Sequence, residues 1–345
     1  MWVYLLKRLL LMVPTLLGVL LLMFVVTQFV PGGPVEPYIM QARGTGVGGE
    51  GAGVAMDYRG AQGINEAQLE RIKALYGFDK PAHERFFKML SQYARFDLGE
   101  SFYQHRSVGG LIVDKLPVSI SLGMWTFLLS YLVAVPLGVA KAVRHGSRFD
   151  AVTTLVVLAG YAVPGFVLGV VLLVLVGEGG LVPLFPLRGL TSSNWEELSL
   201  AGKVLDYLWH IVLPVTAMVV GGFATLTVLT KNAFLEEIRK QYVVTARAKG
   251  LSQKAVLWKH VFRNALIPLV TGFPAAFVGA FFTGSLLIET LFSLDGLGLL
   301  GYEAVLRRDY PVVLGTLYLF TLIGLVTKVI SDFCYVWVDP RVKFE

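Results

Sequence analysis

Charged residues are scarce in this chain of 345 residues, of which 16% are charged and 55% are hydrophobic. Soluble globular domains carry about a quarter charged residues, so the composition argues against a soluble protein and indicates several membrane spans. Cysteine is nearly absent as well. The single Cys334 excludes an internal disulfide and any multi-cysteine metal site, and its place in a late apolar run predicts a small buried side chain.

Motifs that carry chemistry are also missing. The sequence has no G-x-x-x-x-G-K-[ST] run, so we expect no ATP site in this chain. The apolar runs contain no mid-membrane carboxylate or histidine of the kind that ion-coupled carriers use, which leaves a secondary transporter as the weaker alternative. A serine protease would need Ser285 with His210 or His260, but neither histidine lies within an apolar run, so no nucleophile–base pair can be argued.

Six apolar runs are long enough to cross a bilayer as helices of about 20 residues. They cover residues 9–30, 118–143, 151–176, 211–230, 266–288 and 312–338. The first is too long for a signal-peptide core and is followed by no small-x-small cleavage pattern. We therefore predict an all-α, polytopic membrane protein with six transmembrane helices. Its expected parts are a first helix (1–30), a large loop (31–117), a five-helix core (118–338) and a tail (339–345).

The two long loops contain signals for short helices. Residues 44–63 are rich in glycine and predict a mobile loop, and a capping pair of Asn and Gln then opens a helix over 65–76. A second helix is expected over 83–94 and a third near 198–208.

A few residues inside the apolar runs are candidates for special roles. Lys328 and Asp332 are spaced for an i,i+4 ion pair near one end of the last run. Pro164 and Pro274 are candidates for bends around a translocation path, with simple packing as the alternative.

The distribution of charge predicts an orientation. If both termini, the loops at 141–150 and 231–265, and Lys328 and Asp332 near the end of the last run share one side, that side holds 16 of the 30 Lys and Arg residues but only 6 of the 24 Asp and Glu residues. Basic residues are enriched in cytoplasmic loops, so we expect both termini in the cytoplasm.

Residues 231–268, which we call the basic segment, are the one long polar stretch between two late apolar runs. The basic segment contains eight Lys and Arg residues but only two acidic residues. Its apolar side chains recur from Phe234 to Ala246 at helical spacing. Gly250 is suited to end this helix in the left-handed conformation, and Ser252 is suited to cap a second helix. The pattern predicts two capped, amphipathic helices at the cytoplasmic face.

Three interpretations of the basic segment are open. A solvated loop explains its charge but not two capped helices with apolar faces. DNA binding by a helix-turn-helix fits charge and geometry, yet membrane helices on both sides make it improbable. Docking into a groove of a cytoplasmic partner explains both the caps and the apolar faces, and we favour it.

The same residues carry a family resemblance. The stretches YVVTARAKG (242–250) and HVFRNALIP (260–268) resemble the cytoplasmic coupling loop of the inner-membrane permeases of peptide ABC importers, the dipeptide, oligopeptide and nickel group. Val244 stands where the general importer motif has an acidic residue, and the closing proline comes only at Pro268. The stretches PGGP (31–34), LYGFDKP (75–81), FDLGESF (96–102), ETLFSLDGLGLL (289–300) and DPR (339–341) also resemble this family.

The resemblance implies a type I ABC importer permease fold, also called MetI-like, in the bacterial inner membrane. It implies one half of a heterodimeric channel that works by alternating access, with a second permease, two ATPase subunits or one fused ATPase, and a periplasmic peptide-binding protein as partners. ATP and Mg would be held by the ATPase, and no cofactor or nucleic acid by this chain. The glycine-rich 44–63 insert resembles the branch associated with microcin C and longer peptides.

The resemblance also implies roles for particular residues. The residues expected to couple the chain to the ATPase are Tyr242, Thr245, Ala246, Arg247, Lys249, Gly250, Leu251 and Ser252. Residues 289–301, between the fifth and sixth runs, form what we call the outer segment. The resemblance places binding-protein docking or an outer gate there, with simple packing as an equal alternative, at Phe292, Leu294, Asp295 and Gly296.

Overall fold

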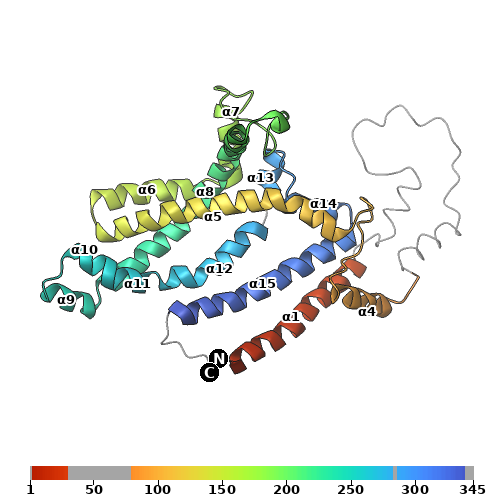
Figure 1. Cartoon of the computed structure of the whole chain (residues 1–345), viewed down its shortest axis with the longest axis horizontal. Coiled ribbons are helices and arrows are strands. Elements are labelled where there is room, and N and C mark those ends of the chain that lie inside the picture. The colour runs from red at the N-terminus through yellow and green to blue at the C-terminus, as the bar shows by residue number, and fades with distance from the viewer. Residues whose placement is uncertain (1, 30–78, 283–285, 339–345) are drawn as a thin grey trace. The chain divides into compact units, whose positions relative to one another are not determined.

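The computed structural model describes residues 2–29, 79–282 and 286–338, and in this part of the chain the regular structure is helical (Figure 1). The predicted all-α class is confirmed. The expected glycine-rich loop at 44–63, the helix at 65–76, Ser285 and the 339–345 tail lie outside the described residues.

In the described part of the chain, the helices follow one another in this order. They are α1 (Trp2–Phe29), α4 (Ala82–Tyr93), α5 (Val108–Val143), α6 (Arg148–Ala162), α7 (Gly165–Val176), the 3-10 turn η1 (Trp195–Glu197), α8 (Leu200–Ile238), α9 (Gln241–Ala248), α10 (Gln253–Val256), the π-helical turn η2 (Leu257–Val261), α11 (Phe262–Ala265), α12 (Ile267–Phe282), α13 (Leu286–Leu291), α14 (Leu297–Leu306) and α15 (Tyr310–Val338).

Four helices are long and apolar enough to cross a membrane, and two bent helix pairs raise the number to six if each pair is one span. The four are in α1, α5, α8 and α15, and the bent pairs are α6 with α7 and 253–265 with α12. Four of the predicted spans correspond to α1, α5, α8 and α15, and the third corresponds to α6 with α7. The fifth, at 266–288, overlaps only α12 of the second bent pair, because 253–265 belongs to the predicted cytoplasmic loop. Two helices extend beyond the expected runs, because α5 begins at Val108 and α8 begins at Leu200. The helix expected at 198–208 is therefore the first part of α8.

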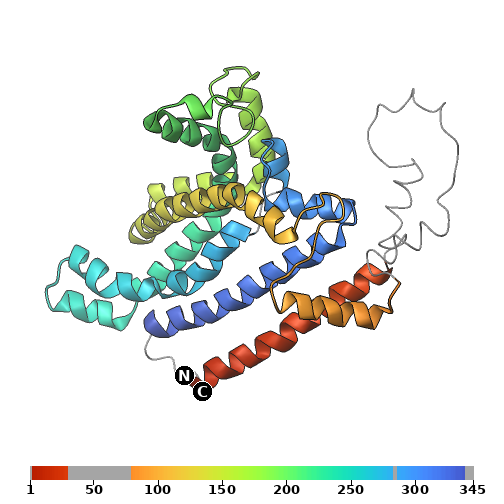
Figure 2. The ribbon, with the colours of Figure 1, turned by 45° about the vertical axis from the view of Figure 1, so that its right-hand side comes forward.

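The third span is broken where the sequence predicts a bend. Helices α6 and α7 meet at an angle of 92°, which Figure 2 shows beside α8. Pro164 disfavours the helical conformation in the residue before it, and Val163 is accordingly extended, with φ −90° and ψ 117°. Pro164 itself precedes the first turn of α7, where a missing N–H leaves no hydrogen bond unmade.

The other predicted bend is displaced. Pro274 lies inside α12, and the 50° bend of this span falls instead at Leu266, between α11 and α12. Pro268 occupies the first turn of α12, so the ring is tolerated there while the preceding turn cannot continue into it. The expectation of a break at Pro274 is thus wrong in position.

The chain forms two compact units. The larger consists of Met1–Arg8, Asp114–Leu300 and Ile323–Glu345, and the smaller of Leu9–Val113 and Gly301–Leu322. In the larger unit, α6, α7, α12 and α13 pack against α8. Its main hydrophobic cluster joins one side of α8 to the outer segment through Ile211, Ala217, Ile288, Phe292 and Leu294.

Two glycines allow this close packing. A β-carbon at Gly138 of α5 would lie 2.6 Å from Cβ of Thr230 in α8. One at Gly169 of α7 would lie 2.8 Å from Cδ2 of Leu291 in α13. Both positions exclude larger side chains because the neighbouring helix occupies the space.

In the smaller unit, hydrogen bonds join the FDLGESF stretch to the residue that precedes α15. Buried Asp309 accepts hydrogen bonds from the hydroxyl of Ser101 (2.5 Å) and the backbone N–H of Phe102 (3.1 Å). The ring of Tyr318 lies 5.0 Å from that of Tyr93 in α4, and its hydroxyl donates to the Tyr93 carbonyl. Burial, together with the charge of Asp97, raises the pKa of Tyr93 far above its usual range.

The predicted pair of Lys328 and Asp332 is wrong. The Asp332 carboxylate is 3.0 Å from Nη2 of Arg8, and it accepts a hydrogen bond from the Tyr4 hydroxyl at 2.8 Å. A guanidinium with a neighbouring phenol satisfies more carboxylate lone pairs than one lysine would, so Asp332 joins α15 to the start of α1 instead.

Candidate functional site

The basic segment folds into a compact helical hairpin at the end of α8 (Figure 1). The first expected helix is interrupted, because α8 ends at Ile238 and α9 begins at Gln241, with Lys240 in an extended conformation between them. Glu237 holds this turn by pairing with the Lys240 ammonium and accepting from the Tyr242 hydroxyl at 2.6 Å. Burial and the hydrogen bond to Glu237 raise the pKa of Tyr242.

Gly250 ends α9 as predicted. Its φ is +82°, and the N–H of Leu251 donates to the carbonyl of Ala246 while the N–H of Gly250 donates to that of Arg247. These two bonds make a Schellman motif, which satisfies carbonyls that the helix end would leave open. Nothing lies within 4 Å of a β-carbon at Gly250, so the backbone conformation alone requires glycine there.

Ser252 caps the second helix, also as predicted. Its hydroxyl accepts from the N–H of Ala255, and the chain then passes through α10, the π-helical turn η2 and α11. A π-turn inserts one extra residue per turn and rotates the following side chains, and such turns are frequent at functional sites. The sequence signals for caps were sufficient to place this helix but not its π-turn.

A hydrophobic cluster joins the two arms of the hairpin, which are α9 and the continuous run of α10, η2 and α11. Its buried members are Ala142, Phe234, Val243, Ala246, Val256, Val261 and Ala265. Phe234 of α8 is 0% exposed, and its ring lies 5.6 Å from that of Phe262. Because the cluster includes residues of α5, α8 and both arms, the hairpin and the ends of these helices form one packed body.

The expected coupling residues divide by burial. Ala246 is buried, and Tyr242 and Leu251 are half-buried. The residues at the surface are Thr245, Arg247, Lys249, Gly250 and Ser252. Val244 of α9 and Trp258 of η2 are also 51% and 53% exposed, so each arm of the hairpin exposes one large apolar side chain in addition to basic ones. An exposed apolar patch with a polar rim is typical of a protein-docking surface.

A buried ion cluster connects α8, which carries the hairpin, to two other helices. The Lys141 ammonium, 1% exposed, lies 3.2 Å from Oδ1 of Asp150 and donates to the hydroxyls of Thr153 and Thr154. Lys231 donates to both carboxylate oxygens of Asp150, at 2.7 and 2.8 Å. Asp150 of α6 therefore holds one lysine from α5 and one from α8. We call Lys141, Asp150 and Lys231 the ion cluster.

Sequence reasoning missed the ion cluster. Its signal was present in Lys141, which lies inside an apolar run, and in Ser147, which precedes Asp150 by three residues as an N-cap does. Lys141 and Asp150 lie on consecutive helices, but Lys231 is 81 residues from Asp150, so the meeting of all three depends on how α5, α6 and α8 pack.

The outer segment places its four expected residues in different environments. Phe292 and Leu294, 2% and 1% exposed, are part of the main hydrophobic cluster. Asp295 is largely exposed and pairs with Lys115 of α5. Gly296 is buried, because a β-carbon there would lie 2.6 Å from the carboxyl carbon of Glu289. Packing therefore accounts for three of these residues.

Glu289 and Ser119 hold the start of α14. The Glu289 side chain is 0% exposed and accepts from the N–H of Leu299 at 2.7 Å. Ser119 of α5 accepts from the N–H of Leu297 at 2.9 Å. A carboxylate at a helix N-terminus satisfies free N–H groups and complements the helix dipole, so these two side chains fix the loop that precedes α14.

The predicted path residues Pro164 and Pro274 occupy unlike sites. Pro164 is exposed at the sharp bend between α6 and α7, and Pro274 is buried within α12. Near Pro274, Phe273 and Phe277 of α12 pack against Phe127 of α5 with ring centroids 4.9 and 5.4 Å away.

Comparison with known proteins identifies relatives along the whole chain. Residues 134–344 match the family model described as "Binding-protein-dependent transport system inner membrane component". The Inner membrane ABC transporter permease protein YejB of Escherichia coli O157:H7 is 53% identical, and the alignment covers 100% of this chain and 100% of the relative. The Peptidoglycan transport system permease protein YejB of Agrobacterium fabrum is 51% identical, over 100% of this chain and 99% of the relative. The Dipeptide transport system permease protein DppB of Escherichia coli K12 is 30% identical over 99% of each.

Proposed function

We propose that this chain, which belongs to the family of binding-protein-dependent transport system inner membrane components, forms one half of the membrane channel of a peptide ABC importer. The basic segment carries the proposal. It is a capped, packed hairpin with an exposed face of Val244, Trp258 and basic residues, and it is continuous with the spanning helix α8. The names of the dipeptide and peptidoglycan permease relatives support a cargo of peptides or peptide-like compounds.

In the proposed mechanism, a cytoplasmic ATPase subunit binds the exposed face of the hairpin and moves it when ATP closes the ATPase. Because α9, α10 and α11 share one hydrophobic cluster with α8, the hairpin transmits this movement as a rigid body. The ion cluster passes it on to α5 and α6 through Asp150. The spans then alternate between openings toward the two sides of the membrane.

The assembly that we propose has three further kinds of component. A second permease completes the channel, two ATPase subunits or one fused ATPase hold ATP and Mg, and a periplasmic binding protein delivers the peptide. Both termini of this chain lie in the cytoplasm, as its charge distribution favours. The sharp bend at Pro164 and the outer segment around Asp295 are proposed for the translocation path and its outer gate.

The test combines assembly with coupling. The whole importer is purified through this chain, reconstituted in proteoliposomes, and assayed for ATPase activity and peptide uptake with Gly250→Val. A β-branched residue at φ +82° distorts the end of α9, so we expect ATP hydrolysis without uptake. Gly179→Val is the matched control, because Gly179 has φ +85° and open space around its Cα but lies far from the basic segment in sequence.

Two results would contradict the proposal. One is uptake by Gly250→Val at the wild-type rate with normal coupling. The other is purification of this chain alone, followed by uptake without ATP in liposomes, which would establish the ion-coupled carrier instead.

A further inference from the structure

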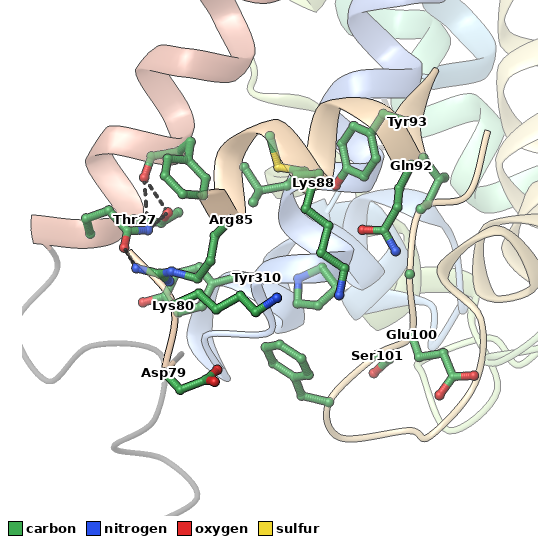
Figure 3. Close-up of a pocket in the computed structure, with 18 of the residues that line it drawn as sticks. Thr27, Asp79, Lys80, Arg85, Lys88, Gln92, Tyr93, Glu100, Ser101 and Tyr310 are labelled. Atoms are coloured by element: carbon green, nitrogen blue, oxygen red, sulfur yellow. Dashed lines mark hydrogen bonds between the residues drawn. The ribbon is translucent and has the colours of Figure 1, made fainter. Parts of the chain in front are cut away.

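The smaller unit contains a cavity of about 750 Å³ that the proposed function does not use (Figure 3). Its walls come from the C-terminal end of α1, from α4, from the FDLGESF stretch and from the start of α15. A volume of this size is in the range of cavities that bind small molecules or headgroups. All of the lining residues belong to the smaller unit, so the cavity is a feature of this unit alone.

One wall of the cavity is basic. Lys80, Arg85 and Lys88 line it, and in Figure 3 the ammonium groups of Lys80 and Lys88 extend into the open space. Arg85 donates to Oε1 of Gln28 at 2.7 Å, which holds the guanidinium at the end of α1. Among the described residues, neither Lys80 nor Lys88 takes part in an ion pair, so both are available to a ligand.

The charges of the lining residues predict an anionic ligand. The carboxylates of Asp79 and Glu100 are the acidic groups of the cavity, against the three cations of the basic wall. The cavity therefore has an excess of one positive charge, which a phosphodiester, with its single negative charge, balances. Ser101 and Tyr310 add hydroxyl groups to the lining. Burial lowers the pKa of Arg85, so an anion beside it would also stabilise the charged guanidinium.

The position of the cavity predicts that this anion belongs to a lipid. Two of its walls are ends of membrane-crossing helices, formed by Thr27 and Gln28 of α1 and by Pro311 of α15. Beside them, α1 exposes a row of large apolar side chains: Leu21, Leu22, Val25, Val26 and Phe29. A basic cavity at the ends of two membrane-crossing helices, beside exposed apolar side chains of α1, suits both the phosphate and the acyl chains of a phospholipid.

We propose that this cavity binds the phosphate group of an anionic phospholipid, with Lys80 and Lys88 as its ligands and the acyl chains lying along α1. Free inorganic phosphate offers the same ligand chemistry without the acyl chains. We prefer the lipid because the ends of two membrane-crossing helices form walls of the cavity, and the same end of α1 exposes large apolar side chains. Neither the cargo nor the ATPase enters this inference.

Photo-crosslinking in nanodiscs tests the site. The full-length chain is reconstituted in phosphatidylcholine that contains a few per cent of a phosphatidylglycerol with a photoreactive headgroup, and the labelled peptides are mapped by mass spectrometry. We expect labels on 79–105 and at the end of α1, and far fewer from the matching phosphatidylcholine probe. A lysine near a membrane surface contributes about 1 kcal/mol to binding an anionic lipid, so Lys88→Gln should lower labelling about fivefold.

Matched variants separate the site from general charge effects. Arg95→Gln removes one positive charge just after α4 without touching the cavity lining, so its labelling should equal that of the wild type. Lys88→Arg keeps the charge and should retain labelling, so that a loss in Lys88→Gln follows the charge at this position. Equal labelling by the two lipid probes, or equal effects of Lys88→Gln and Arg95→Gln, would overturn the proposal.

A second measurement distinguishes lipid from free phosphate. Inorganic phosphate is titrated by calorimetry into the delipidated chain in neutral detergent. We expect no heat of binding at millimolar phosphate. Phosphate binding that Lys88→Gln abolishes, together with absent lipid labelling, would assign the cavity to free phosphate and reject the lipid.

Discussion

At the scale of single residues, the charged groups that matter most are those that meet far from where they stand in the sequence. Lys141 and Asp150 are both within a few per cent of full burial, and Lys231 bridges both oxygens of the same carboxylate. A buried ion pair contributes little net stability, but removal of one partner leaves an uncompensated charge. The sensitivity of the ion cluster to substitution is therefore much greater than that of a surface pair.

Asp150→Asn should strongly destabilise the chain. The substitution leaves two lysine ammonium groups, one of them buried, without a counter-charge, and the expected loss is about 3–5 kcal/mol of unfolding free energy. Thermal unfolding in detergent measures it. Asp295→Asn is the matched control at an exposed pair, where the loss should stay below about 1 kcal/mol. Similar losses in the two variants would show that the ion cluster has no special role.

Gly296→Ala should displace the Glu289 carboxylate. The new methyl group would lie 2.6 Å from its carboxyl carbon, so the cap on α14 must move, at a cost of about 1–3 kcal/mol. Gly301→Ala, inside the same helix and with nothing within 4 Å, should be neutral or slightly stabilising. The melting temperatures of the two variants compare them directly. A Gly296→Ala protein as stable as Gly301→Ala would contradict this account of the outer segment.

At the scale of elements, the sequence predicted helix ends that depend on neighbouring residues, but not a helix end that depends on tertiary packing. Gly250 and Ser252 act within one or two turns of their own positions, so the sequence was enough to predict both caps. Pro164 likewise breaks its span by local sterics. The break at Lys240 has no glycine or proline to mark it. It arises because Val243 and Ala246 turn back to pack with Phe234, and that packing is visible only in the folded chain.

Phe234→Ala should loosen the hairpin from α8. The side chain is fully buried between the two arms, so its removal should cost about 3–5 kcal/mol. Limited trypsin digestion reports the result locally, because Arg239 and Lys240 form the connection between α8 and α9 and should be cut faster. Phe87→Ala, at a ring that is 66% exposed, is the control and should leave the digestion pattern unchanged. Unchanged cutting in Phe234→Ala would mean that the cluster does not hold the hairpin.

At the scale of the whole molecule, composition, apolar runs and charge were enough to predict the fold class, and the described residues contain four helices long and apolar enough to cross a membrane, or up to six spans if each bent pair is one. The pairing of Asp332 with Arg8 and the ion cluster were beyond reach because each joins residues far apart along the chain. The family match shows that the chain is an inner membrane component of a binding-protein-dependent transport system. The hairpin packs on α5 and α8 through one hydrophobic cluster, and the ion cluster joins α8 to α5 and α6, so these contacts connect the proposed docking surface to three helices.

Cysteine cross-linking of the assembled importer tests the docking surface most directly. In a Cys334→Ser background, which has no other cysteine, Thr245→Cys places a thiol on the exposed face of α9. With a short thiol-to-amine cross-linker, we predict a product that contains this chain and an ATPase subunit and whose yield changes when ATP is added. Asn194→Cys, exposed in the loop before α8, should give no such product. Absence of the ATPase from the Thr245→Cys product, or its equal presence with Asn194→Cys, would contradict the docking surface.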